Sequence, residues 1–468
     1  MSIATSENSI GGPAPREPSV MTRLAAAPAG RAVVIGGLLL LLLVPLHYIS
    51  GIVQEREARQ AEVVREFQRS WGPAQSVTGP ILVVPYWSGP DKPRRYLHIA
   101  PNELKAVAQL TPQLRKRGLF HSVVYTGNVR LSGTFVMPPD AVAPDGAALM
   151  WSDAFVMLTA SDLRSLKSSA RLNWNGRSLP WTDCPPAADG TCGGPLFVVA
   201  RPRLAGPPSP GDSIAFETEL ELRGTGAFRL APLGQEVDLT LSAPWPTPSF
   251  AGAVLPESSK VTRGGFDATW HVSSNVATGH AVWSSNTLMG GGGWQQPEDQ
   301  IGVELLEAVP TYQMVDRASK YAILFLALSF LTYFLFELVS HVRIHFVQYG
   351  LLGVSIALFS LLLISLSEPL GFAQGYAVSA ILVLMQASLY TGAVTRRSRL
   401  ALLFAAILAG LFGFFYVVLT LETYSLMTGS LALFAGLSVI MIVTRHLDWS
   451  RAKSDLRSSV PESGLPLA

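Results

Sequence analysis

The residues most able to do chemistry in this chain are two cysteines and eight histidines. Cys184 and Cys192 bracket a loop rich in Pro, Ala and Asp, and no histidine lies near them. A zinc site needs four ligands, so this pair does not form one. Because the spacing is not that of a Cys-x-x-Cys motif, we favour a structural disulfide in an oxidising compartment over a redox centre.

Motifs for nucleophilic or nucleotide-dependent catalysis are missing from the sequence. It contains no His-Glu-x-x-His, no Gly-x-Ser-x-Gly, no Walker phosphate loop and no Gly-x-Gly-x-x-Gly after a strand. The basic run Arg115-Lys116-Arg117 is more typical of a solvated turn than of an anion site. We therefore predict no enzyme activity, no metal site and no cofactor.

Polar side chains in the apolar C-terminal part are the remaining candidates, because ionisable groups within a membrane are functional by default. One basic cluster consists of His341, Arg343 and His345. It is typical of a topology signal that faces lipid headgroups, and a contact with a lipid or a partner is the alternative. Glu337 lies four residues before His341, within helical reach of it. Gln348 is typical of a residue that forms a hydrogen bond between helices. The interfacial or polar candidates are Glu337, His341, Arg343, His345, Gln348 and Glu368.

Charge is unevenly distributed along the chain and divides it into two unlike parts. Charged residues make up 15% of the sequence, against about 25% in soluble proteins. Residues 321–444 carry only seven of them, whereas residues 54–320 carry 25 acidic and 24 basic side chains. The even balance of this middle part leaves no footprint for nucleic acid.

Apolar runs of about 20 residues, the length that crosses a bilayer, predict six membrane spans. The first, residues 32–53, follows three arginines and ends without a cleavage site, which favours a signal anchor. It continues into a charged amphipathic helix at residues 55–71. The other five spans are predicted at residues 321–339, 346–366, 372–394, 400–419 and 424–444.

The loops between these spans set a direction across the membrane. Arg343, Arg396, Arg397 and Arg399 fall on one side, while the opposite short loops carry Glu368 and Glu422 and no basic residue. The positive-inside rule then places both termini in the cytoplasm. We predict cytoplasmic tails at residues 1–31 and 445–468, an extracytoplasmic domain at 54–320 and a five-span bundle at 321–444.

The domain at residues 54–320 has the composition of a folded β-rich structure. It contains nine of the ten tryptophans, and eleven short β-prone runs are separated by Gly, Pro, Asn and Asp. Without βα alternation, this pattern predicts an antiparallel sandwich or several packed sheets. The fold class is therefore a six-span (1 + 5) helical membrane protein with a large, mainly β, sandwich-like extracytoplasmic domain.

Several strings in the chain resemble the CreD family of bacterial inner membrane proteins. One runs from Arg343 to Tyr349 (RIHFVQY), and Ser367–Phe372 (SEPLGF) follows at the end of the next span. Others are YQMVDRASKYAILF at 312–325, LRKRG at 114–118 and WPTPSF at 245–250. The Cys184–Cys192 loop is peripheral to the resemblance, so it does not support the disulfide.

The resemblance implies a bacterial inner membrane protein that supports cell-envelope integrity and tolerance to envelope stress. It brings no catalytic residue and no cofactor. We expect a periplasmic binding or scaffolding role, with membrane lipids and an envelope protein or cell-wall component as partners. The alternative is a transporter or a lipid-handling protein that uses the C-terminal bundle.

The predicted topology can be tested with alkaline phosphatase fusions, because the enzyme is active only outside the cytoplasm. A fusion after about residue 200 should be active, and one after Arg397 should be inactive. The reverse pattern would overturn the orientation deduced from the loop arginines.

Overall fold

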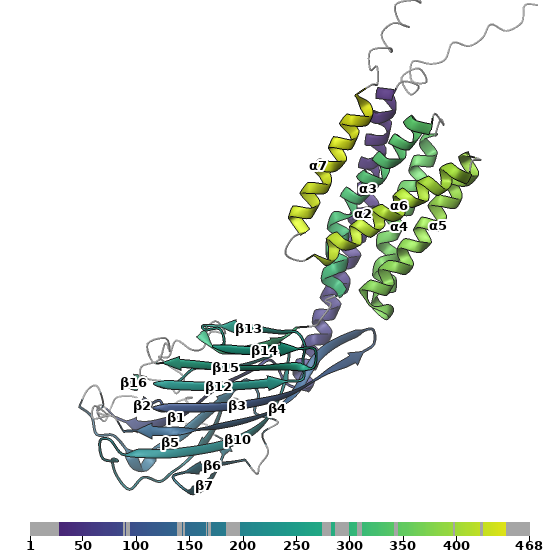
Figure 1. Cartoon of the computed structure of the whole chain (residues 1–468). Helices are drawn as coiled ribbons and strands as arrows, with labels where there is room; N and C mark the ends of the chain where they lie inside the picture. The colour runs from purple at the N-terminus through teal and green to yellow at the C-terminus, as the bar shows by residue number, and fades with distance from the viewer. Residues whose placement is uncertain are drawn as a thin grey trace, which may run out of the picture. The chain divides into compact units, whose positions relative to one another are not determined.

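The computed structural model describes residues 28–87, 89, 94–137, 143, 146–164, 166, 170–183, 197–273, 282–285, 299–306, 311–340, 345–395, 398–421 and 425–445. The chain divides into two compact units (Figure 1). Unit 1 comprises Met1–Glu57 and Pro310–Ala468, and unit 2 comprises Ala58–Val309. Each unit has its own hydrophobic core.

Unit 2 is built from two β-sheets and the C-terminal part of helix α2 (Pro28–Ser70). The nine-stranded sheet contains β1 (Gln75–Tyr86), β2 (Arg95–Ile99), β5 (Phe155–Ala160), β8 (Thr182–Asp183), β9 (Phe197–Ala200), β11 (Ala227–Leu230), β13 (Pro248–Gly252), β16 (Val282–Ser285) and β17 (Ile301–Leu305). The eight-stranded sheet contains β3 (Glu103–Arg117), β4 (Phe120–Val136), β6 (Arg171–Trp174), β7 (Arg177–Pro180), β10 (Ser213–Thr225), β12 (Glu236–Ala243), β14 (Ser258–Thr262) and β15 (Gly265–Ser273).

The core of unit 2 lies between the two sheets, because the central strands of the eight-stranded sheet bury alternate residues. Strand β10 alternates exposed and buried side chains along nearly its whole length. Its buried Phe216, Leu220 and Leu222 join one cluster with Leu82 and Val156 of the nine-stranded sheet. This is the period of two expected for a sheet with one solvated face.

The mainly β architecture agrees with the sequence prediction, but its details differ. The described residues form 17 strands rather than eleven. Two strand pairs, β1 with β11 and β12 with β3, are parallel. Most strand pairs are antiparallel, as an antiparallel sandwich predicts, and these two pairs are the exception. The sequence did not reveal them, because both pairs join strands distant in the chain, and strand periodicity carries no information about their direction.

Unit 1 is a helical bundle formed by the N-terminal part of α2 and by α3 (Thr311–Ser340), α4 (Phe346–Leu370), α5 (Phe372–Thr395), α6 (Ser398–Thr420) and α7 (Ser425–Thr444). Phenylalanines from three helices meet at its centre: Phe325 lies 4.7 Å from Phe412 and 6.1 Å from Phe359, ring centroid to centroid. Helix α2 packs against α4 at Gly353, where a Cβ atom would come within 2.2 Å of Leu42.

Four described helices are long and apolar enough to cross a membrane: Val33–Ser70, Phe346–Leu370, Phe372–Thr395 and Ser398–Thr420. Many large apolar side chains of this unit are exposed, among them Leu389, Leu402 and Phe434. Such a surface is typical of contact with lipid rather than water. The predicted spans at 321–339 and 424–444 fall on helices α3 and α7, and the count of six stays a prediction.

The two-sheet core predicts a sharp difference between two leucines of unit 2. Leu220 is 0% exposed on β10, whereas Leu255 is 66% exposed. Leu220→Ala should lower the free energy of unfolding by about 3 kcal/mol through lost burial and a new cavity. Leu255→Ala should change it by less than about 0.5 kcal/mol. Urea unfolding followed by tryptophan fluorescence measures both, and equal losses would contradict this core.

Candidate functional site

The polar residues singled out in the C-terminal part do not form one site. Glu337 is 4% exposed, and its Oε2 accepts a hydrogen bond of 2.8 Å from the Tyr349 hydroxyl. Glu368 lies near the other end of α4, where it accepts a hydrogen bond of 3.1 Å from the Tyr312 hydroxyl. An ion pair of 3.7 Å joins Glu368 to Arg56. Tyr349 and Glu368 are separated by about 30 Å of helix.

His345 and Gln348 have a structural role that the sequence prediction missed. The His345 ring accepts a hydrogen bond from the Val347 backbone NH, and the Gln348 side chain accepts one from the His345 backbone NH. Together they form a capping box at the start of α4. His341, Arg343, Cys184 and Cys192 lie outside the described residues.

The polar groups within the spans also fail to converge. Gln374 is exposed near the start of α5. Gln386, also exposed, lies about 18 Å further along the same helix and accepts a hydrogen bond of 3.1 Å from Ser355. Glu337 bonds a tyrosine of the next helix, Gln386 bonds a serine of α4, and Gln374 is exposed, so these three residues do not converge on one place.

A different set of residues is brought together on the solvated side of the eight-stranded sheet, which we call the polar face. Strand register aligns one residue from each of five adjacent strands, β15, β12, β3, β4 and β10. We call this alignment the polar row: Asp267, Ser242, Gln109, Asn128 and Glu221.

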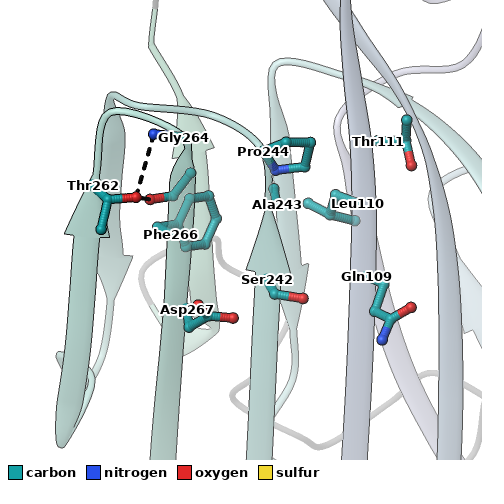
Figure 2. Close-up of a pocket in the computed structure, with 11 residues that line it drawn as sticks. Gln109, Leu110, Thr111, Ser242, Ala243, Pro244, Thr262, Gly264, Phe266 and Asp267 are labelled. Carbon is teal, nitrogen blue, oxygen red and sulfur yellow. Dashed lines mark hydrogen bonds between the residues drawn. The ribbon is translucent and has the colours of Figure 1, made fainter.

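Two shallow pockets lie along the polar row and share Gln109 and Thr111. The first, of about 440 Å³, spans β3, β12 and β15, and Figure 2 shows Gln109, Ser242 and Asp267 side by side on these strands. The second, also of about 440 Å³, continues across β4 and β10. The two pockets together follow the row from one end to the other.

The second pocket ends close to the last residues of helix α2. Arg223 lines this pocket, and its guanidinium carbon lies 4.9 Å from the centre of the Trp71 ring. The guanidinium carbon of Arg115 lies 4.1 Å from the same centre. The Trp71 indole NH is held by the Tyr125 carbonyl at 3.1 Å. Cation–π contact and this hydrogen bond fix the ring in place beside the polar face.

Charges of both signs surround the row. Asn128 donates a hydrogen bond of 2.7 Å to Glu219, and Arg130 lies 3.9 Å from Glu217. Further along the face, His271 Nδ1 lies 2.7 Å from an Asp238 carboxylate oxygen. This hydrogen bond raises the pKa of His271 above its ordinary value of 6.5.

The row offers amide, hydroxyl and carboxylate groups, which bind a polar ligand by hydrogen bonds. Its two carboxylates, Asp267 and Glu221, are four strands apart, or about 19 Å. Carboxylates that act together on one bond lie within about 10 Å of each other. The row is therefore suited to recognising an extended polar molecule, not to acid–base work by this pair.

The sequence contained only part of the signal for this row. Alternation in residues 216–222 shows which side chains of β10 share a face. The alignment of Gln109 with Ser242 depends on the parallel pairing of β3 with β12, which the sequence did not reveal.

Comparison with known proteins gives a consistent result over most of the chain. The model of the family "Inner membrane protein CreD" matches residues 27–450. The Inner membrane protein CreD of Escherichia coli (strain K12) is 28% identical over 432 residues, covering 88% of this chain and 92% of that protein.

Among solved structures, a putative nutrient binding protein from Legionella pneumophila is 9% identical, covering 56% of this chain and 79% of that one. Its TM-score of 0.25 is too low to support an argument about fold or function.

The hydrogen-bonded pair of His271 and Asp238 predicts how the stability of unit 2 depends on pH. Because the folded pKa of His271 is raised, its contribution to stability is present below about pH 6.5 and is lost as the pH rises through the raised value. Asp238→Asn should return the pKa of His271 towards 6.5. NMR titration of the histidine side chains, with His271→Gln for assignment, measures this change. Asp267→Asn is the control, and an unchanged pKa in Asp238→Asn would contradict the pairing.

Proposed function

Because the chain belongs to the CreD family of inner membrane proteins, we propose that it supports the integrity of the cell envelope by a binding role of unit 2, without catalysis. In this proposal unit 2 lies in the periplasm and six spans hold it at the inner membrane. Both termini face the cytoplasm, as the loop arginines indicate.

The observation that carries the proposal is the polar row on the solvated face of the eight-stranded sheet. Five adjacent strands contribute hydrogen-bonding side chains in register, and two open pockets follow them. An extended ligand that contacts such a row gains many weak hydrogen bonds rather than one deep anchoring contact. This geometry fits a polymer or a protein strand of the envelope better than a small molecule, which prefers an enclosed, mostly apolar pocket.

The functional groups of the polar row indicate which class of partner could bind there. Gln109 and Asn128 present amides, Ser242 presents a hydroxyl, and Asp267 and Glu221 present carboxylates at the two ends. These groups match a partner rich in hydroxyl and amide groups. A cell-wall component has this character, and so does the backbone of an envelope protein.

The alternative, a transporter or lipid-handling protein, requires polar groups that meet inside the bundle. Glu337 is bonded to Tyr349, Gln386 to Ser355, and Gln374 is exposed. The described part of unit 1 offers no shared polar cavity among these three residues, so no observation favours the alternative.

The proposed role can be tested by complementation in the native bacterium. Cells lacking the gene should become more sensitive to detergent or to a β-lactam, and the wild-type gene should restore tolerance. A Gln109→Ala/Asn128→Ala variant should fail to restore it, because both central amides of the row are lost. Its abundance and unfolding should stay near wild type, since both side chains are exposed.

The matched control is Gln235→Ala, an exposed glutamine of unit 2 outside the row, which should complement fully. Unchanged sensitivity of the deletion strain under conditions that express the protein would argue against the envelope role. Full complementation by the double variant would remove the polar row from it.

A further inference from the structure

The hairpin between β3 and β4 ends in an unusual combination of apolar and basic residues. We call residues 114–119 (LRKRGL) the hairpin tip. All six are exposed, with Leu114 at 54% and Leu119 at 53%. Hairpin turns in water normally carry polar residues or glycine. Here the turn pairs Gly118, at φ +63°, with a leucine at the apex.

Alternation along β3 separates the tip into two faces. The face of Arg115 and Arg117 turns towards α2: Arg115 stacks on Trp71, and Arg117 forms an ion pair of 2.7 Å with Glu66. Leu114 and Lys116 point to the opposite side. Within the described residues, no carboxylate forms a salt bridge with Lys116. The outer face thus combines apolar surface with positive charge.

The same two contacts give the direction of the hairpin. Along β3 towards the tip, the contact changes from Trp71, which follows the last residue of α2, to Glu66 within α2. The tip therefore points towards the N-terminal side of the part of α2 that belongs to unit 2.

We propose that the hairpin tip docks on the surface of an anionic phospholipid bilayer, with Leu114 and Leu119 entering the headgroup region and Lys116 contacting lipid phosphates. Leucines beside basic residues are the composition of segments that bind a membrane surface. Unit 2 is joined at both ends to a unit that carries membrane-span candidates. Two leucines alone would bind a bilayer weakly. A chain that is anchored in the same bilayer raises the effective concentration of the lipid surface, so a weak contact is sufficient.

A protein partner fits the tip less well. No tip residue lines the two pockets along the polar row or the pocket beside Arg65 and Arg164. A narrow convex apex offers too little area for a stable protein interface. The inference is independent of the polar row, so either can fail without the other.

The test uses the full chain in lipid nanodiscs, with Cys184 and Cys192 replaced by serine. Leu119→Cys is labelled with the environment-sensitive dye NBD. In discs containing phosphatidylglycerol, the NBD emission should shift to the blue and should be quenched by lipids brominated on their acyl chains. Both effects should weaken in phosphatidylcholine discs and at high salt, because screening removes the attraction of Lys116.

Two variants make the result specific. Leu255→Cys, at a leucine of unit 2 that is even more exposed than Leu119, carries the same dye and should show no shift, which controls for the affinity of NBD itself. Lys116→Gln should lower the ratio of docked to undocked tip by about fivefold, the value of one basic residue near an anionic surface.

Three outcomes would overturn the proposal. One is the absence of quenching at position 119 in anionic discs. Another is equal quenching at positions 119 and 255. The third is a shift at position 119 that persists in phosphatidylcholine and in Lys116→Gln, because it would indicate a contact with protein or neutral lipid.

Discussion

Strand β4 imposes the constraint on which unit 2 depends. It pairs with all 15 residues of β3 on one side and with the 13 residues of β10 on the other, in one unbroken register. A slip by a single residue would turn Leu131 and Val129 to solvent and Arg130 and Asn128 into the core. Burying charged and amide groups without partners is costly, so the hydrophobic core and the polar face fix each other.

The same constraint explains how side chains that could bind a partner are held in position on this sheet. Residues of the polar row need no network of their own to hold them, because their backbones are fixed by ladder hydrogen bonds and their strand neighbours are buried. Gln109 lies between Ala108 and Leu110, both fully or almost fully buried. Exposed side chains on a rigid ladder can therefore vary in type with little effect on stability, which leaves them open to selection for binding.

Periodicity and composition predicted the mainly β domain and long apolar helices, of which four described ones could span a membrane. They could not predict the polar row, because Gln109 and Ser242 lie far apart in the chain and meet only through a parallel pairing. The sequence also predicted an interfacial or polar role for His345 and Gln348. The capping box shows a local reason for both residues: they satisfy backbone NH groups at the start of α4 that no helical carbonyl can reach.

Several polar groups of unit 1 are bonded within the bundle, whereas those of the polar row in unit 2 lie on an exposed face. In an apolar bundle an unsatisfied hydroxyl or carboxylate is costly, so polar groups bond a carbonyl of their own helix, as Ser379 does, or a group on a neighbouring helix. The Tyr376 hydroxyl donates to the Phe412 carbonyl at 2.6 Å, and Tyr349 to Glu337 at 2.8 Å. Groups engaged in this way hold helices together and are not available to a passing solute. The polar row, in contrast, lies along two open pockets on an exposed sheet face, where a partner can replace water as a hydrogen-bonding neighbour.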